Sequence, residues 1–140
     1  MGTQGPFPRV RSANGRAAYP VGSVAAFEIE HVQDGGPDVA VVAVAGELDL
    51  SNADDLVEQL GVAAAGRPLV VDLNRVLFID SAALHRLFVV ARESGVARLA
   101  LVAEANAPVA RTLEIVQFHR AAIVATSVGE ACAAVTRPRG

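Results

Sequence analysis

The stretch Val76–Leu84, which reads V-L-F-I-D-S-A-A-L, joins a strand pattern to a helix pattern. A nearly continuous apolar run, Leu69–Leu73, precedes it and is typical of an inner strand that is covered on both faces. After it, apolar residues recur at i, i+3, i+4 and i+7 along one helix face, at Leu84, Leu87, Phe88 and Ala91. The stretch therefore predicts a strand–helix unit with Asp80 and Ser81 at its junction.

Asp80 and Ser81 can each be interpreted in two ways. Both residue types cap helices well, because their side-chain oxygens accept the backbone N–H groups that a helix start leaves unpaired. The same helix start carries partial positive charge and favours an anion. The junction is thus either a plain cap or a place where a phosphate on Ser81 would be tolerated, and the residues alone leave both interpretations open.

Strand and helix patterns continue to alternate outward from this unit. Phe27–Val32 and Val39–Ala45 are typical of a hairpin, with a turn at 34–37. The other predicted elements are a helix that begins at Ser51 or Asn52, strands at Arg98–Val102 and Ala121–Ala125, a helix from Ala107 with the buried stripe Val109, Leu113 and Val116, and a last helix after Ser127. The order β-β-α-β-α-β-α-β-α predicts a single α/β domain with a mixed, mostly parallel sheet and an N-terminal hairpin.

Residues 1–22 differ from the rest of the chain in composition. They are rich in Gly, Pro, Ser and Ala, and they carry Arg9, Arg11 and Arg16 but no acidic residue. This composition predicts a flexible basic N-terminal tail ahead of a domain at 23–137. The tail is either an arm that docks on an acidic surface or an untied terminus, and untied termini are the more common case.

Composition and charge exclude several classes of protein. The 140 residues are 52% hydrophobic and 19% charged, and the formal net charge of −3 argues against a general nucleic-acid binder. Cys132 is the only cysteine, so no intrachain disulfide can form, and no apolar run approaches the ~20 residues that span a bilayer. We therefore expect a soluble cytoplasmic protein without membrane or nucleic-acid partners. All 12 basic residues are arginine, which suggests a GC-rich bacterial genome.

Motifs for metal, cofactor or catalytic chemistry are weak. The three histidines, His31, His85 and His119, are too far apart to form a ligand cluster, and no glycine-rich phosphate loop is present, so we expect no metal and no cofactor. A serine hydrolase would use Ser81 with His85 at i+4. However, its nucleophile elbow needs glycine two residues either side of the serine, where this chain has Ile79 and Ala83. We therefore expect no enzyme.

Cys132 falls on the apolar stripe of the last predicted helix. Core packing is the simpler interpretation of a cysteine there, and redox sensing is the alternative.

At these residues the chain resembles the STAS domain of anti-sigma factor antagonists, bacterial regulators that release a sigma factor by binding its anti-sigma factor. The resemblance spans about Phe27 to Val135. It is carried by G-E-L-D-L-S-N-A at Gly46–Ala53, by V-D-L-N-R-V-L-F-I-D-S-A-A-L at Val71–Leu84, and by the element order. It implies a STAS-like fold and, as partner, an anti-sigma factor that is a histidine-kinase-like serine kinase and brings its own ATP. A weak homodimer is also compatible with it.

The chain departs from the family pattern at the phosphorylation site. In the family, Phe-(Ile/Met)-Asp-Ser-(Ser/Thr)-Gly-Leu carries the phospho-acceptor at its second hydroxyl residue, and Phe78, Ile79, Asp80, Ser81 and Leu84 match it. Ala82 stands at the phospho-acceptor position and Ala83 at the glycine. Three interpretations follow: Ser81 is a displaced acceptor, the protein is an always-competent antagonist controlled by its amount, or it responds to another input.

The resemblance also predicts where the partner binds. The expected surface comprises the loop Asp80, Ser81, Ala82 and Ala83, the helix face with His85, Arg86 and Arg92, and the segment Glu47–Asn52 with Asp49 and Ser51. Ser81 is the local candidate for phosphorylation. The alternative function is that of an accessory or ligand-binding STAS module in a transporter or signalling complex.

Overall fold

The computed structural model describes residues 26–32, 36–95, 98–104 and 106–136. Its elements are the strands β2 (Phe27–Val32), β3 (Ala40–Leu48), β4 (Leu69–Ile79), β5 (Leu99–Val102) and β6 (Ile123–Ala125), the helices α1 (Ala53–Ala64), α2 (Ser81–Ser94), α3 (Ala107–Ile115) and α4 (Val128–Thr136), and the short 3-10 helix η3 (Phe118–Arg120). This order confirms the predicted α/β class. The predicted tail at 1–22 lies outside the described residues.

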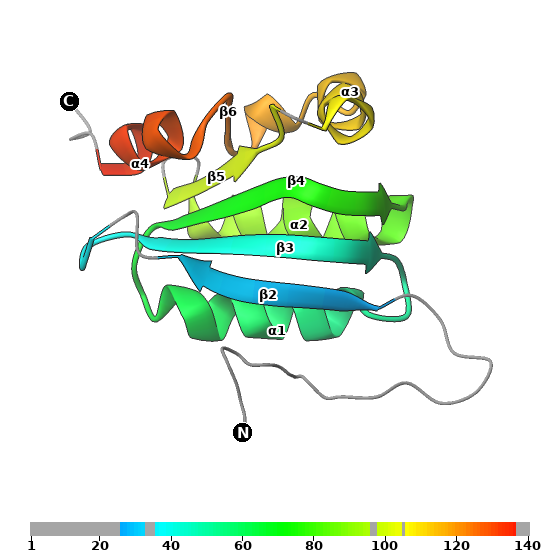
Figure 1. Cartoon of the computed structure of the whole chain (residues 1–140), viewed down its shortest axis with the longest axis horizontal. Coiled ribbons are helices and arrows are strands. Elements are labelled where there is room, and N and C mark those ends of the chain that lie inside the picture. The colour runs from blue at the N-terminus through cyan, green and yellow to red at the C-terminus, as the bar shows by residue number, and fades with distance from the viewer. Residues whose placement is uncertain (1–25, 33–35, 96–97, 105, 137–140) are drawn as a thin grey trace.

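The five strands form one mixed sheet in the order β2-β3-β4-β5-β6. β2 runs antiparallel to β3, which confirms the predicted hairpin, and the other neighbouring pairs are parallel. The carboxyl ends of β3 and β4 therefore lie at the same edge, on the right in Figure 1, where β2 begins. Helices α1 and α2 start from this edge.

Two apolar cores lie on opposite faces of the sheet. The larger core joins inward residues of β3, β4 and β5 to α1, α2, α3 and η3. The smaller core joins Val41, Val70 and Val102 of the opposite sheet face to Ala131 and Val135 of α4. Both faces of β4 and β5 are thus covered, which explains the continuous apolar runs of these strands.

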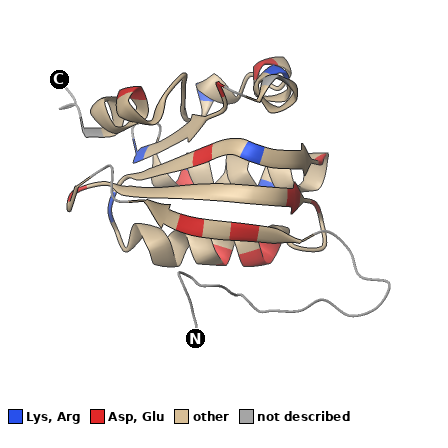
Figure 2. Cartoon of the chain, in the orientation of Figure 1, with Lys and Arg blue, Asp and Glu red and all other residues tan. Residues whose placement is uncertain are grey.

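Helix α1 confirms the amphipathic pattern expected of a surface helix. Leu56 and Leu60 are buried against the sheet, whereas Asp54, Asp55 and Glu58 are exposed on the outside (Figure 2). The two aspartates lie in the first turn, where negative charge interacts favourably with the helix dipole.

Strands β3 and β4 extend beyond the residues that the sequence predicted. β3 continues to Leu48 instead of Ala45, and β4 continues to Ile79 instead of Leu73. The pairing of the two strands is interrupted by register shifts between Ala43 and Ala45 and between Gly46 and Glu47. A bulge adds an unpaired residue and breaks the period of two, so the apolar pattern ended before the strands did.

The region between α3 and β6 also differs from the prediction. Val116 follows the end of α3 and is exposed, so it does not extend the buried stripe of Val109 and Leu113. The 3-10 helix η3 precedes β6, which begins at Ile123 instead of Ala121. Phe118 in η3 fills the core and meets Phe88 of α2 edge-to-face, with ring centroids 5.4 Å apart. Its burial fixes the chain in a tight turn where a longer strand was expected.

Helix α4 starts with reciprocal side-chain and backbone hydrogen bonds. The Glu130 backbone N–H donates to Ser127 Oγ at 3.0 Å, and the Thr126 N–H donates to Glu130 Oε1 at 2.8 Å. The predicted cap at Ser127 is thereby confirmed. The hydrogen bonds from the Thr126 backbone and hydroxyl lower the pKa of Glu130 from its ordinary 4.5.

The Glu130 carboxylate should make a pH-dependent contribution to stability. Its folded-state pKa is lowered, so the contribution is present above pH 4.5 and is lost as the pH falls through the folded-state value. We expect Glu130→Gln, which mimics the protonated side chain, to lower the urea midpoint at neutral pH and to match wild type in acid. Urea unfolding across the pH range checks this, and a midpoint difference that persists unchanged in acid would contradict it.

Candidate functional site

The candidate site lies where β3 and β4 end and α1 and α2 begin. The loop 49–52 connects β3 to α1, and Asp80 alone connects β4 to α2. The Asp80 N–H donates to the Leu48 carbonyl oxygen at 3.0 Å, which continues the pairing of the two strands up to the loop. Asp80 and Leu48, which are far apart in the sequence, are therefore held side by side.

Asp80 ties the two loops together through its carboxylate. Oδ1 accepts the Ala83 N–H at 2.9 Å and so caps α2, as predicted. Oδ2 accepts the Leu50 N–H at 3.3 Å from the other loop. Ser81 is the first helical residue and not the cap, so its exposed hydroxyl lies on the surface of the site.

The loop 49–52 is braced by its own polar side chains. Asp49 Oδ1 accepts the Ser51 N–H at 2.8 Å and also the Ser51 hydroxyl. Asn52 stands at the predicted cap position of α1, but its side chain makes no cap hydrogen bond. Instead it accepts the Asp49 N–H at 3.0 Å and donates to the Glu47 carbonyl oxygen at 2.9 Å. Buried Asn52 therefore fixes the shape of the loop.

The structure brings some of the predicted site residues to the surface and not others. Asp49, Ser51, Asp80, Ser81 and Ala82 cluster at this edge with partly or fully exposed side chains. His85 is exposed one turn further along α2.

Three other predicted residues are buried, ion-paired or remote from this edge. Ala83 is fully buried, so its methyl group packs in the core below the site. Arg86 Nε lies 3.0 Å from Asp54 Oδ1 of α1, in an ion pair at the surface. Arg92 is in the last turn of α2, about 16 Å along the helix axis from Ser81. These three residues therefore do not belong to the exposed cluster at this edge.

Three exposed apolar residues lie at this edge, and only Leu50 belongs to the predicted surface, in the segment Glu47–Asn52. Leu50 is 76% exposed, Leu77 is 78% exposed and Phe78 is 53% exposed. Leu50 is held by Asp80, and Phe78 pairs with Glu47 of β3. We call Leu50, Leu77 and Phe78 the apolar edge. The sequence carries one signal for it, because the consecutive apolar residues 76–79 of a strand cannot all point into one core.

Asn106 supports the irregular end of β4 from the side of α3. Its Nδ2 donates to the carbonyl oxygens of Leu73, at 3.1 Å, and of Val76, while its Oδ1 accepts the Val109 N–H at the start of α3. These bonds satisfy strand carbonyls that the bulge turns away from regular pairing. Asn106 thus anchors the β4 backbone directly before Leu77 and Phe78.

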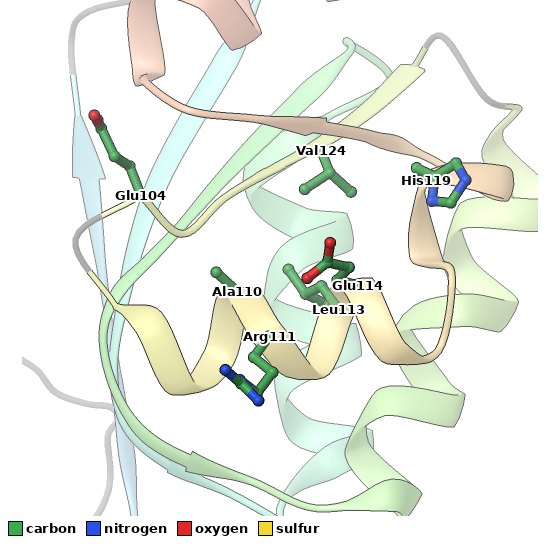
Figure 3. Close-up of a pocket in the computed structure, with 7 residues that line it drawn as sticks. All are labelled: Glu104, Ala110, Arg111, Leu113, Glu114, His119 and Val124. Atoms are coloured by element: carbon green, nitrogen blue, oxygen red, sulfur yellow. The ribbon is translucent and has the colours of Figure 1, made fainter.

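An open pocket of about 560 Å³ lies away from this edge, between α3, η3 and β6 (Figure 3). Its lining residues are Glu104, Ala110, Arg111, Leu113, Glu114, His119 and Val124, and none of them is a predicted site residue. Within the described ranges, no group of three or more His, Cys, Asp or Glu residues could hold a metal ion. None of the described helices is long and apolar enough to span a bilayer.

Known proteins with a similar fold include anti-sigma factor antagonists. The structure of an anti-sigma factor antagonist from Mycobacterium paratuberculosis matches with a TM-score of 0.66 and 25% identity, over 81% of this chain and 96% of that chain. The anti-sigma factor antagonist SpoIIAA in its unphosphorylated form matches with a TM-score of 0.58 and 20% identity, over 82% of this chain and 100% of that chain. At that identity the second match concerns the fold alone. No curated protein matches the sequence significantly.

The model of the STAS domain matches residues 30–131. This range begins within β2 and ends within α4, and it includes β3, β4, β5, β6 and both loops of the candidate site. The chain therefore belongs to the STAS domain family.

Proposed function

We propose that the protein is an anti-sigma factor antagonist, which binds an anti-sigma factor with the apolar edge and the surrounding polar residues and so frees a sigma factor. The observation that carries the proposal is the exposure of Leu50, Leu77 and Phe78 around the capped start of α2. The likeness to the mycobacterial antagonist supports the kind of partner.

The composition of this edge suits binding to a protein. Exposed apolar side chains that cluster within a polar rim are typical of interfaces, because their burial supplies most of the affinity. Here partly or fully exposed polar residues, Asp49, Ser51 and Ser81, lie on the loop 49–52 and at the start of α2. The loops below are fixed by Asp80 and Asn52, so little conformational entropy is lost on association.

Ala82 determines how such an antagonist would be controlled. Alanine has no hydroxyl to phosphorylate, so the protein would remain competent to bind and would act according to its amount. Exposed Ser81 is the one hydroxyl residue at the start of α2. We propose that the partner is a histidine-kinase-like anti-sigma factor in the cytoplasm and that phosphorylation, if it occurs at this edge, occurs at Ser81.

A negative charge at position 81 should weaken the complex. A carboxylate at the first turn of α2 is compatible with the fold because of the helix dipole, whereas on a docked surface it must be desolvated against the partner. We expect Ser81→Asp to lower affinity for the anti-sigma factor about tenfold, or about 1.4 kcal/mol, by isothermal calorimetry. Ser81→Asn is the neutral control. Equal affinities of the Asp variant and wild type would reject Ser81 as a switch.

Restoring the missing hydroxyl should create a kinase substrate. Ala82 is half-buried in the first turn of α2, next to exposed Ser81. A serine adds only one oxygen atom to the alanine side chain, so it fits at this position. We expect Ala82→Ser, incubated with the anti-sigma factor and ATP, to gain one phosphate by intact-mass spectrometry. The Ala82→Ser/Ser81→Ala variant assigns the phosphate to position 82. No phosphate on either variant would contradict a kinase partner of this kind.

The partner class is tested by affinity capture. The immobilised chain is exposed to lysate of the source organism, and bound proteins are identified by mass spectrometry, with a Leu50→Ser/Leu77→Ser variant as the matched bait. Recovery of an anti-sigma factor by wild type, and its loss with the variant, supports the proposal. Recovery of transporter or signalling-complex subunits instead would favour the alternative function as an accessory STAS module.

A further inference from the structure

Among the described residues, no helix packs on one half of the second sheet face. α4 packs against β4, β5 and β6 and covers Val41, Val70 and Val102. Further toward the carboxyl end of β3, the same face carries Ala43 and Ala45, which are only half-buried. In Figure 1, α1 and α2 lie behind β2, β3 and β4, and this face of the three strands is turned to the viewer.

Acidic side chains flank Ala43 on both sides and Ala45 on one side. Phe27 and Ile29 of β2 pack on the larger core, so Glu28 and Glu30 point to the opposite face. The register sets Glu30 beside Ala43 and Ala43 beside Asp72 of β4, and it sets Glu28 beside Ala45. We call Glu28, Glu30, Ala43, Ala45 and Asp72 the acidic sheet face. Arg75, beside Ala45, is the basic neighbour of this surface (Figure 2).

The opposite charge is concentrated in the segment that precedes β2. All 15 acidic residues of the chain lie after residue 25, whereas residues 1–25 carry Arg9, Arg11 and Arg16 and no acid. These residues lie outside the described part of the structure. The point where they join the sheet is nevertheless fixed at Ala26, close to Glu28 in the sequence. The Ala26 carbonyl oxygen accepts the Glu47 N–H at 2.9 Å.

We propose that residues 1–25 dock on the acidic sheet face, with their arginines against Glu28, Glu30 and Asp72 over the alanine floor. Opposite charges attract the segment, and the covalent link at Ala26 gives it a high effective concentration at this surface. A second copy of the chain is a poorer occupant, because a two-fold contact would set the same carboxylates against each other. The docking needs no partner protein, so its test is separate from that of the antagonist role.

Paramagnetic relaxation in the full chain tests the docking. A nitroxide is attached at Ala13→Cys in a Cys132→Ala background, and amide intensities are compared in the oxidised and reduced states. We expect loss of the amide signals of Glu30, Ala43 and Asp72. Recovery of these signals is expected in 1 M NaCl, where the Debye length falls to about 3 Å. Signals that stay unchanged on oxidation would overturn the proposal.

Charge variants assign the contact to this face. Glu28→Gln/Glu30→Gln should restore the signals of Ala43 and Asp72, as should replacing Arg9, Arg11 and Arg16 by glutamine. Asp55→Asn/Glu58→Gln, on the exposed face of α1, is the control that removes the same number of charges away from this face. In this variant the amide signals of Ala43 and Asp72 should still be lost on oxidation. Two results would contradict docking on the acidic sheet face. One is signal loss at Ala43 and Asp72 that persists in Glu28→Gln/Glu30→Gln, and the other is signal loss on α1 in place of β3.

Discussion

Leu50→Ser combined with Leu77→Ser should weaken binding to the anti-sigma factor by about 30-fold or more, or at least about 2 kcal/mol. Both side chains are more than three-quarters exposed in the free protein, so they gain most of their burial only when a partner covers them. Each leucine contributes about 1.5–3 kcal/mol when it is fully removed from water, and incomplete burial lowers this value. The measurement is the dissociation constant by calorimetry or surface plasmon resonance.

The chain offers a matched control for this double substitution. Val62 of α1 is 74% exposed and Ile115 at the end of α3 is 71% exposed, and neither lies on the loops that meet at Asp80. Val62→Ser/Ile115→Ser removes a similar exposed apolar area away from the site and should leave the affinity unchanged. Both double variants should unfold close to the wild-type temperature, because exposed substitutions change stability little. A similar loss of affinity in the two variants would mean that the apolar edge is not the interface.

Short sequence patterns predicted the elements whose ends depend only on residues nearby in the chain. Helix α2 begins after Asp80, at the predicted junction, because the cap and the apolar stripe lie within the helix or next to it. The far ends of β3 and β4 could not be predicted in the same way. Their length depends on pairing between strands and on the bulges near Ala43 and Gly46, which no short window of sequence contains.

The candidate site was predicted in part for the same reason. Asp80 was expected to cap α2, but its bond to the Leu50 N–H joins residues from two separate loops. Leu77 and Phe78 lie beyond the predicted strand Leu69–Leu73, and the bulged end of β4 exposes both. Ala83 was predicted on the surface, and the first turn of α2 directs it inward instead. Which face each residue presents was therefore decided by tertiary structure.

Among the substitutions proposed for this protein, Gly46→Ala should be the most destabilising, with a loss of about 3 kcal/mol in the free energy of unfolding. Gly46 has φ +110°, a conformation that residues with a Cβ rarely adopt. An added Cβ would also collide with the Ala26 carbonyl oxygen and lie 2.9 Å from Phe27 Cα. Because that carbonyl accepts the Glu47 N–H, the start of β2 would have to move away from β3. For a chain of this size we expect the melting temperature to fall by about 10 °C.

Two other glycines separate backbone strain from steric collision. Gly66 has φ +83° but open space where a Cβ would be, so Gly66→Ala should show the conformational cost alone, about 1 kcal/mol. Gly61 lies inside α1 with open space around it, and Gly61→Ala should stabilise the protein by about 0.5–1 kcal/mol. Thermal unfolding of the three variants tests the order.

If Gly46→Ala lowers the free energy of unfolding no more than Gly66→Ala does, the close approach of β2 to β3 is not what requires glycine at position 46. If Gly46→Ala lowers the free energy of unfolding clearly more, the glycine of G-E-L-D-L-S-N-A is required because the start of β2 lies close beside it. This close approach holds the Ala26 carbonyl against Glu47, the residue that pairs with Phe78. The same variant should then also perturb the apolar edge, and amide signals of Glu47 and Phe78 would shift in the folded fraction while those of α4, on the other side of the sheet, would not.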